Sequence, residues 1–393
     1  MSNAEIDQVL NSGVQDGTLP GVVVMAVGPD RTYYQAAFGF ANAAEATPMR
    51  VDTIFKVSSL TKAVTTAALM QLVERGLLSL DQPASSIVPA FKDIQVLDGF
   101  DGGVPVLRPP RREVTVAHLA THTSGLAYDI WSEKARQYRA WVGASTGITG
   151  GRDSLESPLM FDPGEAWAYG PGIDWLGEIV QAVTQRRIDD YLEQEIFKPL
   201  EMKDTAFHVP LAKRERVSAV HTRRDAESFD VLDFQWSKEP ANERILSGHG
   251  LYCTVPDYSR FLQMFLNAGA SAKGRRVLKP ETVAAMAQNR IGDVDVGVME
   301  TTNKGLSLDA EFFPGMKKKH SAGFQITTEQ WPGMRSAGSL SWAGLLNLFY
   351  WWDPERRIAV TFASQLLPFQ DKRVMSLFSE LEQAIYRSDW ARG

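Results

Sequence analysis

Cysteine is almost missing from this chain: Cys253 is the single one among 393 residues. One cysteine excludes a disulfide within the chain, and it also excludes a metal site built from several thiolates. Cys253 lies in an apolar stretch, where a small buried thiol is the expected state. Disulfides therefore contribute nothing to the stability that we expect for the fold.

Long apolar runs are missing as well. No stretch reaches the length of about 20 residues that a membrane-spanning helix needs, and the polar segment Met1–Glu5 has no apolar leader core. From this we expect a cytoplasmic protein without a membrane partner.

Positive charge is not in excess, since 41 Lys and Arg face 47 Asp and Glu, for a net charge of −6. That balance argues against nucleic acid as a partner. The one basic cluster, Lys317–His320, is short, and we interpret it as a solvated loop rather than a phosphate or lipid site.

The hydrophobic pattern predicts strands at both ends of the chain and helices in between. Its length of 393 residues allows two or three domains, or one large domain with an inserted lobe. No alternation of strand and helix typical of a parallel sheet is visible. We therefore expect an α/β (α+β) fold with an antiparallel sheet from residues 1–80 and 236–393, flanked by helices, and an inserted, mainly helical lobe at 81–235. The predicted strands are 21–28, 33–40, 345–352 and 358–364, and the predicted helices are 6–14, 60–76, 173–183 and 371–385.

The stretch from Phe55 to Lys62 is the most informative part of the sequence. Apolar residues recur near the 3.6-residue period from Leu60 onward, and Gly76 is a natural end for that helix. Ser59 then lies at the helix start, with Lys62 on the same face one turn later. A hydroxyl beside an amine, close to the positive end of a helix, suits a nucleophile. The plainer alternative is a capping serine followed by a surface lysine.

Three further motifs follow in the chain. Residues 115–126 open with a helix start and close on a turn, a Pro-Gly loop at 161–171 delivers Tyr169, and residues 338–344 lead into a late strand. Together with the Ser59 stretch, they resemble the serine β-lactamase and penicillin-binding-protein superfamily. The resemblance is closest to its class C-like esterase and transacylase branch, the family VIII carboxylesterases, and it implies a β-lactamase/transpeptidase-like fold.

The resemblance implies a role for each matching residue. Ser59 matches the acylated nucleophile, Lys62 its amine partner, and Tyr169 the tyrosine of the Tyr-x-Asn element. It also implies an oxyanion hole made by the backbone N–H groups of Ser59 and Leu345, and it implies no cofactor and no metal.

Sequence leaves open which group accepts the serine proton. An unperturbed lysine or tyrosine has a pKa of about 10 and is mostly protonated at neutral pH. A cation beside a phenol favours the phenolate, whereas burial favours the neutral amine. The proton acceptor is therefore a property of the coupled pair, Lys62 and Tyr169.

Two departures from the penicillin-recognising members concern the substrate. Trp342 stands where they carry a Lys or His, and Pro171 stands where they carry the Asn of Tyr-x-Asn. Because paired polar groups discriminate against substrates that lack their partners, losing these groups favours a neutral, fairly apolar ester over a β-lactam. The residues expected to line the substrate site are Trp342, Ala343, Gly344, Pro171 and His249.

The sequence thus predicts a serine hydrolase that cleaves carboxylic esters of small molecules through an acyl-Ser59 intermediate. An acyltransferase that passes the acyl group to an alcohol is the first alternative, and a weak β-lactamase or peptidase is the second. A non-catalytic binding module is disfavoured, because Ser59, Lys62 and Tyr169 are all present.

Two other signals point to different chemistry. Ser145 lies in a Gly-x-Ser-x-Gly pattern at 143–147, but a loop pattern follows it instead of the helix that a nucleophile elbow needs. His118 and His122 are four residues apart and could share a helix face, yet no Glu stands in a zincin-like position. We interpret both as structural.

Overall fold

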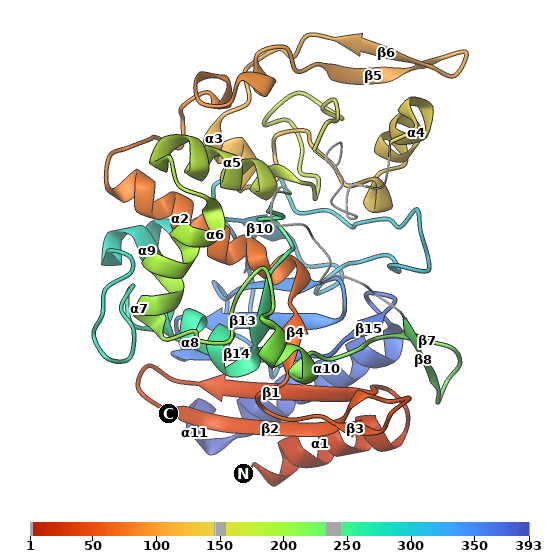
Figure 1. Cartoon of the computed structure of the whole chain (residues 1–393), viewed down its shortest axis with the longest axis vertical. Coiled ribbons are helices and arrows are strands. Elements are labelled where there is room, and N and C mark those ends of the chain that lie inside the picture. The colour runs from red at the N-terminus through yellow and green to blue at the C-terminus, as the bar shows by residue number, and fades with distance from the viewer. Residues whose placement is uncertain (1–2, 145, 147–154, 233–244, 393) are drawn as a thin grey trace.

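A computed structural model describes residues 3–144, 146, 155–232 and 245–392. In these residues an eight-stranded sheet combines strands from both ends of the chain, in the order β10-β11-β12-β13-β14-β1-β2-β3 (Figure 1). Every neighbouring pair is antiparallel, which confirms the predicted fold class. The strands are β1 (Gly21–Val27), β2 (Thr32–Asn42), β3 (Thr47–Pro48), β10 (Lys318–His320), β11 (Gln325–Thr327), β12 (Leu340–Gly344), β13 (Leu348–Asp353) and β14 (Ile358–Ala363).

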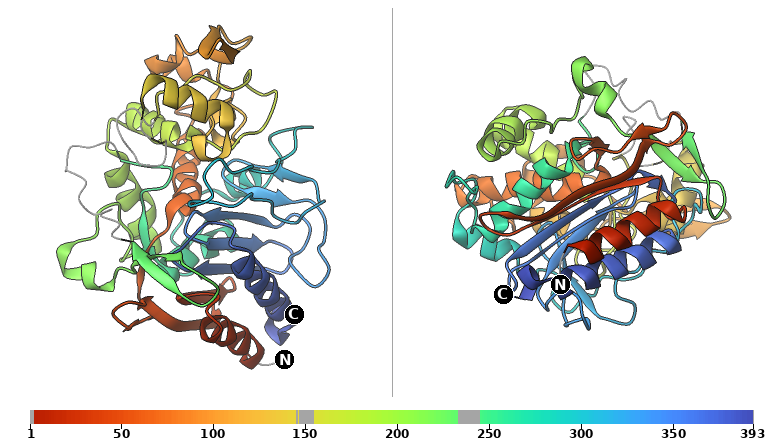
Figure 2. Two further views of the ribbon diagram at one scale, coloured as in Figure 1. Left: turned by 90° about the vertical axis from the view of Figure 1, so that its right-hand side faces the viewer. Right: turned by 90° about the horizontal axis from the view of Figure 1, so that it is seen from below.

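Helices cover both faces of this sheet, so its central strands are buried along their whole length and mostly apolar. Every residue of β1, β13 and β14 is buried. On one face lie α1 (Ala4–Gln15) and α10 (Lys372–Arg387), side by side in Figure 2. The ring of Phe378 in α10 packs on three sheet rings at centroid distances of 4.4 to 5.7 Å, those of Phe349, Trp351 and Phe362. The short helix α11 (Asp389–Arg392) follows α10.

On the other face, α8 (Val255–Leu266) lies against the sheet, and α2 (Thr61–Glu74) runs through the middle of the molecule (Figure 1). Twelve of the fourteen residues of α2 are buried, as expected for a helix with neighbours on every side. Its contacts with α5 (Gly172–Thr184) join the sheet to the middle part of the chain. The predicted helices are thus confirmed.

The middle part of the chain also contains strands that the sequence did not predict. Two of these strands lie on either side of Gly102–Gly103. β5 (Val96–Asp101) and β6 (Val104–Arg108) form a hairpin there, because both glycines adopt the positive φ of a tight turn, +56° and +85°. The remaining helices are α3 (Val116–Ala120), α4 (Glu133–Val142), α6 (Ile188–Leu192), α7 (Lys198–Leu200) and α9 (Pro280–Met286).

The predicted limits of the inserted lobe, 81–235, stay a prediction. β7 (Val220–Arg223) pairs with β8 (Phe229–Leu232) and, in parallel, with β15 (Leu366–Leu367). The chain therefore reaches the C-terminal strands again before residue 236.

Most of the basic cluster at residues 317–320 forms an edge strand, β10, which begins at Lys318. The interpretation as a solvated loop was wrong for Lys318 and His320, which are buried, and holds for Lys317, whose side chain is 81% exposed. Lys318 pairs with Glu311 at 3.1 Å and Lys319 with Asp295 at 2.8 Å, so two carboxylates neutralise these charges.

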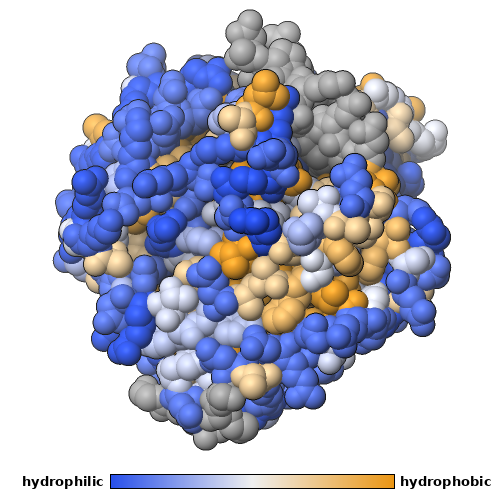
Figure 3. All heavy atoms as spheres, turned by 60° about the horizontal axis from the view of Figure 1, so that its bottom comes forward, coloured by the Kyte–Doolittle hydropathy of each residue, from blue (hydrophilic) through white to orange (hydrophobic). Residues whose placement is uncertain are grey.

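Figure 3 shows the molecule with its lower side tilted toward the viewer, and hydrophobic residues gather near the centre of a mostly hydrophilic face. Among the residues described, no helix combines the length and the apolar character needed to cross a membrane.

Candidate active site

Ser59 lies where a short strand bends into the buried helix α2. β4 (Ile54–Lys56) pairs with β9 (Tyr252–Thr254), and one 3-10 turn, η1 (Ser58–Leu60), leads into α2. Ser58 has φ +49°, a strained conformation for a residue with a side chain. The Thr61 hydroxyl holds this bend, because it donates to the Ser58 carbonyl at 2.6 Å and accepts from the Leu251 amide at 3.2 Å. The predicted helix start is therefore confirmed, with Ser59 half-buried on it.

Lys62 lies one turn further along α2 and is 2% exposed. Its Nζ is 3.3 Å from Ser59 Oγ, 3.2 Å from the Tyr128 hydroxyl and 2.8 Å from the Gly248 carbonyl oxygen. An ammonium would donate to all three atoms. A neutral amine would donate to Tyr128 and Gly248 and accept from Ser59. Only the hydrogen bond between Ser59 and Lys62 changes direction between the two protonation states. A proton can therefore pass from Ser59 to Lys62 while the other two hydrogen bonds of Lys62 stay as they are.

Tyr169 packs its ring on Lys62, with Nζ 4.9 Å from the ring centroid. Its hydroxyl oxygen accepts a hydrogen bond from Trp342 Nε1 at 3.0 Å, in a buried position. Trp342 therefore presents a neutral N–H donor to this tyrosine.

Tyr128 is a site residue that the sequence analysis missed. Its hydroxyl accepts from Lys62 and donates to Asp174 Oδ2 at 3.4 Å, a long hydrogen bond. Burial, and then the charge of Asp174, raises the pKa of Tyr128 well above its usual value. Tyr128 thus keeps its proton and is poorly suited to act as the base.

Asp174 was missed as well. It is 3% exposed, in the first turn of α5, and its Oδ1 accepts from the Gly248 amide at 2.8 Å. A Cβ on Gly248 would lie 2.2 Å from Asp174 Oδ2, so glycine is needed for this close approach. His249 is also buried, with Nδ1 3.8 Å from Asp174 Oδ2.

Aromatic rings form a wall beside Lys62. His122 and His320 lie 5.3 Å apart within it, and burial lowers the pKa of both, to about 4 for His320. These imidazoles are therefore neutral near neutral pH. The other rings of the wall are Trp131, Trp167, Tyr169 and Trp342.

The shared helix face expected for His118 and His122 does not form. α3 ends at Ala120, and His122 has φ +61° beyond it. His118 instead completes a capping box with Thr115, whose amide donates to His118 Nδ1 at 3.1 Å. In the described ranges, no group of three His, Cys, Asp or Glu side chains is placed to hold a metal ion.

The end of β12 packs against η1, the turn that carries Ser59. Gly344, the last residue of β12, lies so close to η1 that an added Cβ would be 2.7 Å from the Val57 carbonyl oxygen. This contact is compatible with an oxyanion hole formed by the amides of Ser59 and Leu345.

Gly344→Ala tests that arrangement. The new methyl group must push β12 away from η1, and losing one oxyanion donor costs about 10²- to 10³-fold in rate. We expect at least about a tenfold slower acylation, measured as the rate of fluorophosphonate labelling. Gly297→Ala is the control, because a Cβ there meets nothing within 4 Å. Equal labelling rates in both variants would argue against the proposed hole.

The other predicted residues lie as follows. Pro171 is buried and begins α5, and Ala343 is buried in β12. Cys253 is buried in β9, as expected. Ser145 lies outside the described residues.

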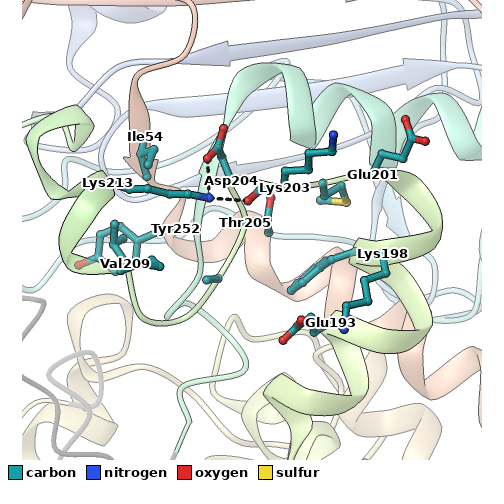
Figure 4. Close-up of a pocket in the computed structure, with 14 residues that line it drawn as sticks. Ile54, Glu193, Lys198, Glu201, Lys203, Asp204, Thr205, Val209, Lys213 and Tyr252 are labelled. Atoms are coloured by element: carbon teal, nitrogen blue, oxygen red, sulfur yellow. Dashed lines mark hydrogen bonds and ion pairs between the residues drawn. The ribbon is translucent and has the colours of Figure 1, made fainter.

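A cavity of about 460 Å³ lies elsewhere, between α7 and β9 (Figure 4). Its rim charges are paired with one another, as for Lys213 with Asp204 at 2.9 Å and Lys198 with Glu193 at 3.1 Å. None of the candidate catalytic residues lines it, so its size alone does not make it the active site.

The antiparallel sheet and the serine-lysine pair define an enzyme of the serine β-lactamase-like class. The chain belongs to the Beta-lactamase family, whose family model matches residues 6–383. It is 30% identical to an acyltransferase, calJ, of Penicillium decumbens over 84% of this chain and 80% of the relative. It is 28% identical to a lovastatin esterase of Penicillium rubens, over 97% and 98% of the two chains. The structure of the simvastatin synthase LovD from Aspergillus terreus superposes with a TM-score of 0.83 and 26% identity, covering 98% of this chain and 97% of LovD.

Proposed function

We propose that the protein is a carboxylesterase that forms an acyl-Ser59 intermediate and can also pass the acyl group to an alcohol. The observation that carries the proposal is the 3.3 Å contact between Ser59 Oγ and Lys62 Nζ, at the start of a buried helix. A serine hydroxyl is too weak an acid to attack unaided, and an adjacent amine supplies the required base.

In the first step, Ser59 Oγ attacks the ester carbonyl carbon while its proton passes to the pair formed by Lys62 and Tyr169. The negative charge that develops on the carbonyl oxygen is stabilised by the backbone amides of Ser59 and Leu345. Collapse of this intermediate expels the alcohol, which takes the proton back. Water then attacks the carbonyl carbon of the acyl-serine and gives its proton to the same pair, Lys62 and Tyr169. Ser59 leaves, takes that proton back, and the acid is released.

A neutral, apolar ester is the proposed substrate class. The wall beside Lys62 is aromatic, and Trp342 supplies a neutral donor, already engaged by Tyr169, instead of a cation. A β-lactam carboxylate would have to be buried there without a counter-charge, which is costly. Trp342, Ala343, Gly344, Pro171 and His249 are the residues that we propose to line the substrate site.

Acyl transfer is the second candidate, and the acyltransferase among the relatives favours it. Water at about 55 M competes strongly, so transfer requires an alcohol that is held in position for attack. The aromatic wall is the surface that we propose to hold an apolar alcohol.

The test compares p-nitrophenyl esters of increasing chain length with a chromogenic cephalosporin. We expect ester turnover to exceed cephalosporin turnover by at least about a hundredfold, since two polar recognition groups are missing. Faster cephalosporin turnover would contradict the proposal.

The acyltransferase activity is read from the ratio of new ester to acid as an apolar alcohol is added at millimolar concentration. We expect a measurable share of new ester, and we expect Trp342→Lys to reduce that share by removing the apolar surface. Val298→Lys, at a half-exposed position outside the wall, is the matched control and should leave the ratio unchanged. A ratio no higher than that of base-catalysed exchange would leave hydrolysis as the sole activity.

A further inference from the structure

A buried carboxylate, to which the proposed chemistry assigns no part, lies behind Lys62. Asp174 is on α5, whereas Lys62 is on α2, and the two side chains do not touch directly. Two separate routes connect them. In one, Asp174 Oδ2 accepts from the Tyr128 hydroxyl, whose oxygen accepts from Lys62. In the other, Asp174 Oδ1 accepts from the amide of Gly248, whose carbonyl oxygen accepts from Lys62.

Both routes end on the two Lys62 contacts that do not involve Ser59. A lysine ammonium rotates freely unless its hydrogens are fixed by acceptors. Here the Tyr128 oxygen and the Gly248 carbonyl fix two of its three directions, which leaves the third aimed at Ser59 Oγ. Both acceptors are in turn held by the same carboxylate.

We propose that Asp174 is the positioning residue of this site: it orients Lys62 through Tyr128 and Gly248 and balances the positive charge on Lys62 when Ser59 gives up its proton. The proposal rests on the acyl-Ser59 chemistry above. In many enzymes with a serine nucleophile, a third group orients the base that activates the nucleophile. Here Ser59 is the nucleophile, Lys62 belongs to the base, and Asp174 is the orienting group.

The remaining contacts of Asp174 agree with this role. Ser247, beside Gly248, donates its hydroxyl to the Asp174 carbonyl oxygen at 3.2 Å, so the backbone of α5 anchors the same segment. A Cβ on Gly177, one turn further along α5, would lie 2.1 Å from Ser247 Oγ. Helix and segment are thus in contact along two turns, and Asp174 cannot be displaced without moving the acceptor of Lys62.

Other titratable groups surround this network, and their protonation states must not change over the pH range of the experiment. Burial makes Tyr128 keep its proton and His122 stay neutral. The groups that face Asp174 or Lys62 from the packed elements are Tyr128, Tyr169, His122 and His249, and the charge of Asp129 acts on Tyr128.

Asp174→Asn is the direct test, because an amide keeps the size and still accepts from the Gly248 amide. It loses the negative charge, and its NH₂ faces the Tyr128 hydroxyl. We expect kcat for a p-nitrophenyl ester to fall by about a hundredfold, with KM within about twofold. The pH profile of kcat/KM should move as well, because the variant removes a buried negative charge beside the groups that transfer the proton. A merely structural role would lower stability without moving that profile.

Asp257→Asn is the matched control. Asp257 is also buried and also accepts from a backbone amide, that of Asp204, and from a hydroxyl, that of Thr205. We expect it to lose stability with an unchanged pH profile. Tyr128→Phe cuts one of the two routes and should give a smaller fall in kcat, of about tenfold.

The outcomes separate this inference from the proposed function. If fluorophosphonate labels Ser59 in the wild type, while folded Asp174→Asn and Tyr128→Phe both keep wild-type kcat and pH profile, the positioning role is overturned and the esterase proposal stands. If Asp174→Asn does not fold, Tyr128→Phe decides by the same two readouts. Full activity of Ser59→Ala would instead overturn the proposed function.

Discussion

Ser59→Ala is expected to abolish both ester turnover and covalent labelling by a fluorophosphonate. The substitution removes the hydroxyl that we propose to carry the acyl group, while the buried helix α2 and the Lys62 contacts to Tyr128 and Gly248 remain. Removing a nucleophile of this kind costs several orders of magnitude, so we expect a fall of at least about 10⁴-fold. Turnover of a p-nitrophenyl ester and mass spectrometry of the labelled protein measure it.

Ser145→Ala is the control for this experiment, since Ser145 lies in the competing Gly-x-Ser-x-Gly pattern. We expect it to keep near-normal turnover and labelling. The reverse pattern, with label on Ser145 and an active Ser59→Ala, would refute the assignment of the nucleophile.

Lys62→Ala and Tyr169→Phe are each expected to slow acylation by at least about a hundredfold. Lys62 is the sole side-chain nitrogen among the described residues that contacts Ser59 Oγ, and Tyr169 packs on that lysine with its oxygen bound by Trp342. Because the groups act as one unit, the double variant should be far less impaired than the product of the two single effects. Single-turnover kinetics with excess enzyme measure the acylation step directly.

Tyr191→Phe provides the matched control. Tyr191 is also buried and uses its hydroxyl in a hydrogen bond to Gln71, but it lies on α6 outside the site. We expect little change in its acylation rate. A Tyr169→Phe variant that behaves like Tyr191→Phe would reduce Tyr169 to a packing role.

The central strands of the large sheet could be predicted because they are buried and mostly apolar. The segments around β1, β13 and β14 are nearly continuous hydrophobic runs, and Pro354 marks the turn between the last two. The hairpin of β5 and β6 could not be predicted in the same way. It is short, largely exposed and contains Pro105, so its strands have no apolar pattern, and only the glycine turn marks them.

Within the site, the sequence predicted the contact between Ser59 and Lys62, because their spacing along one helix determines it. It missed the contacts of Tyr128 and Asp174, which form between segments that are far apart in the chain. Ser59 and Lys62 are one helical turn apart, so their proximity follows from α2 itself. Tyr128 and Asp174 come from two other segments, and the hydrogen-bond network that links them to Lys62 forms only after α5 has packed on α2. The one signal for Tyr128 was its position, two residues beyond a motif that already pointed to the site.

β10 shows the opposite error, in which a local pattern was misleading. Three lysines in a row normally indicate solvent exposure, but here Glu311 and Asp295 neutralise two of them at a sheet edge. Those carboxylates are recognised as partners only once the strand is in place.

The position of β1 in the sheet has a consequence for synthesis of the chain. β1 pairs with β2 on one side and with β14 on the other, so residues near opposite ends of the sequence are neighbours. On the ribosome, the β1–β2 hairpin emerges first, and the open edge of β1 waits for Ala359–Ala363 until translation is nearly complete. An unpaired apolar edge of this kind is a site of aggregation. A ribosome that stalls before β14 therefore leaves a chain that cannot close its sheet.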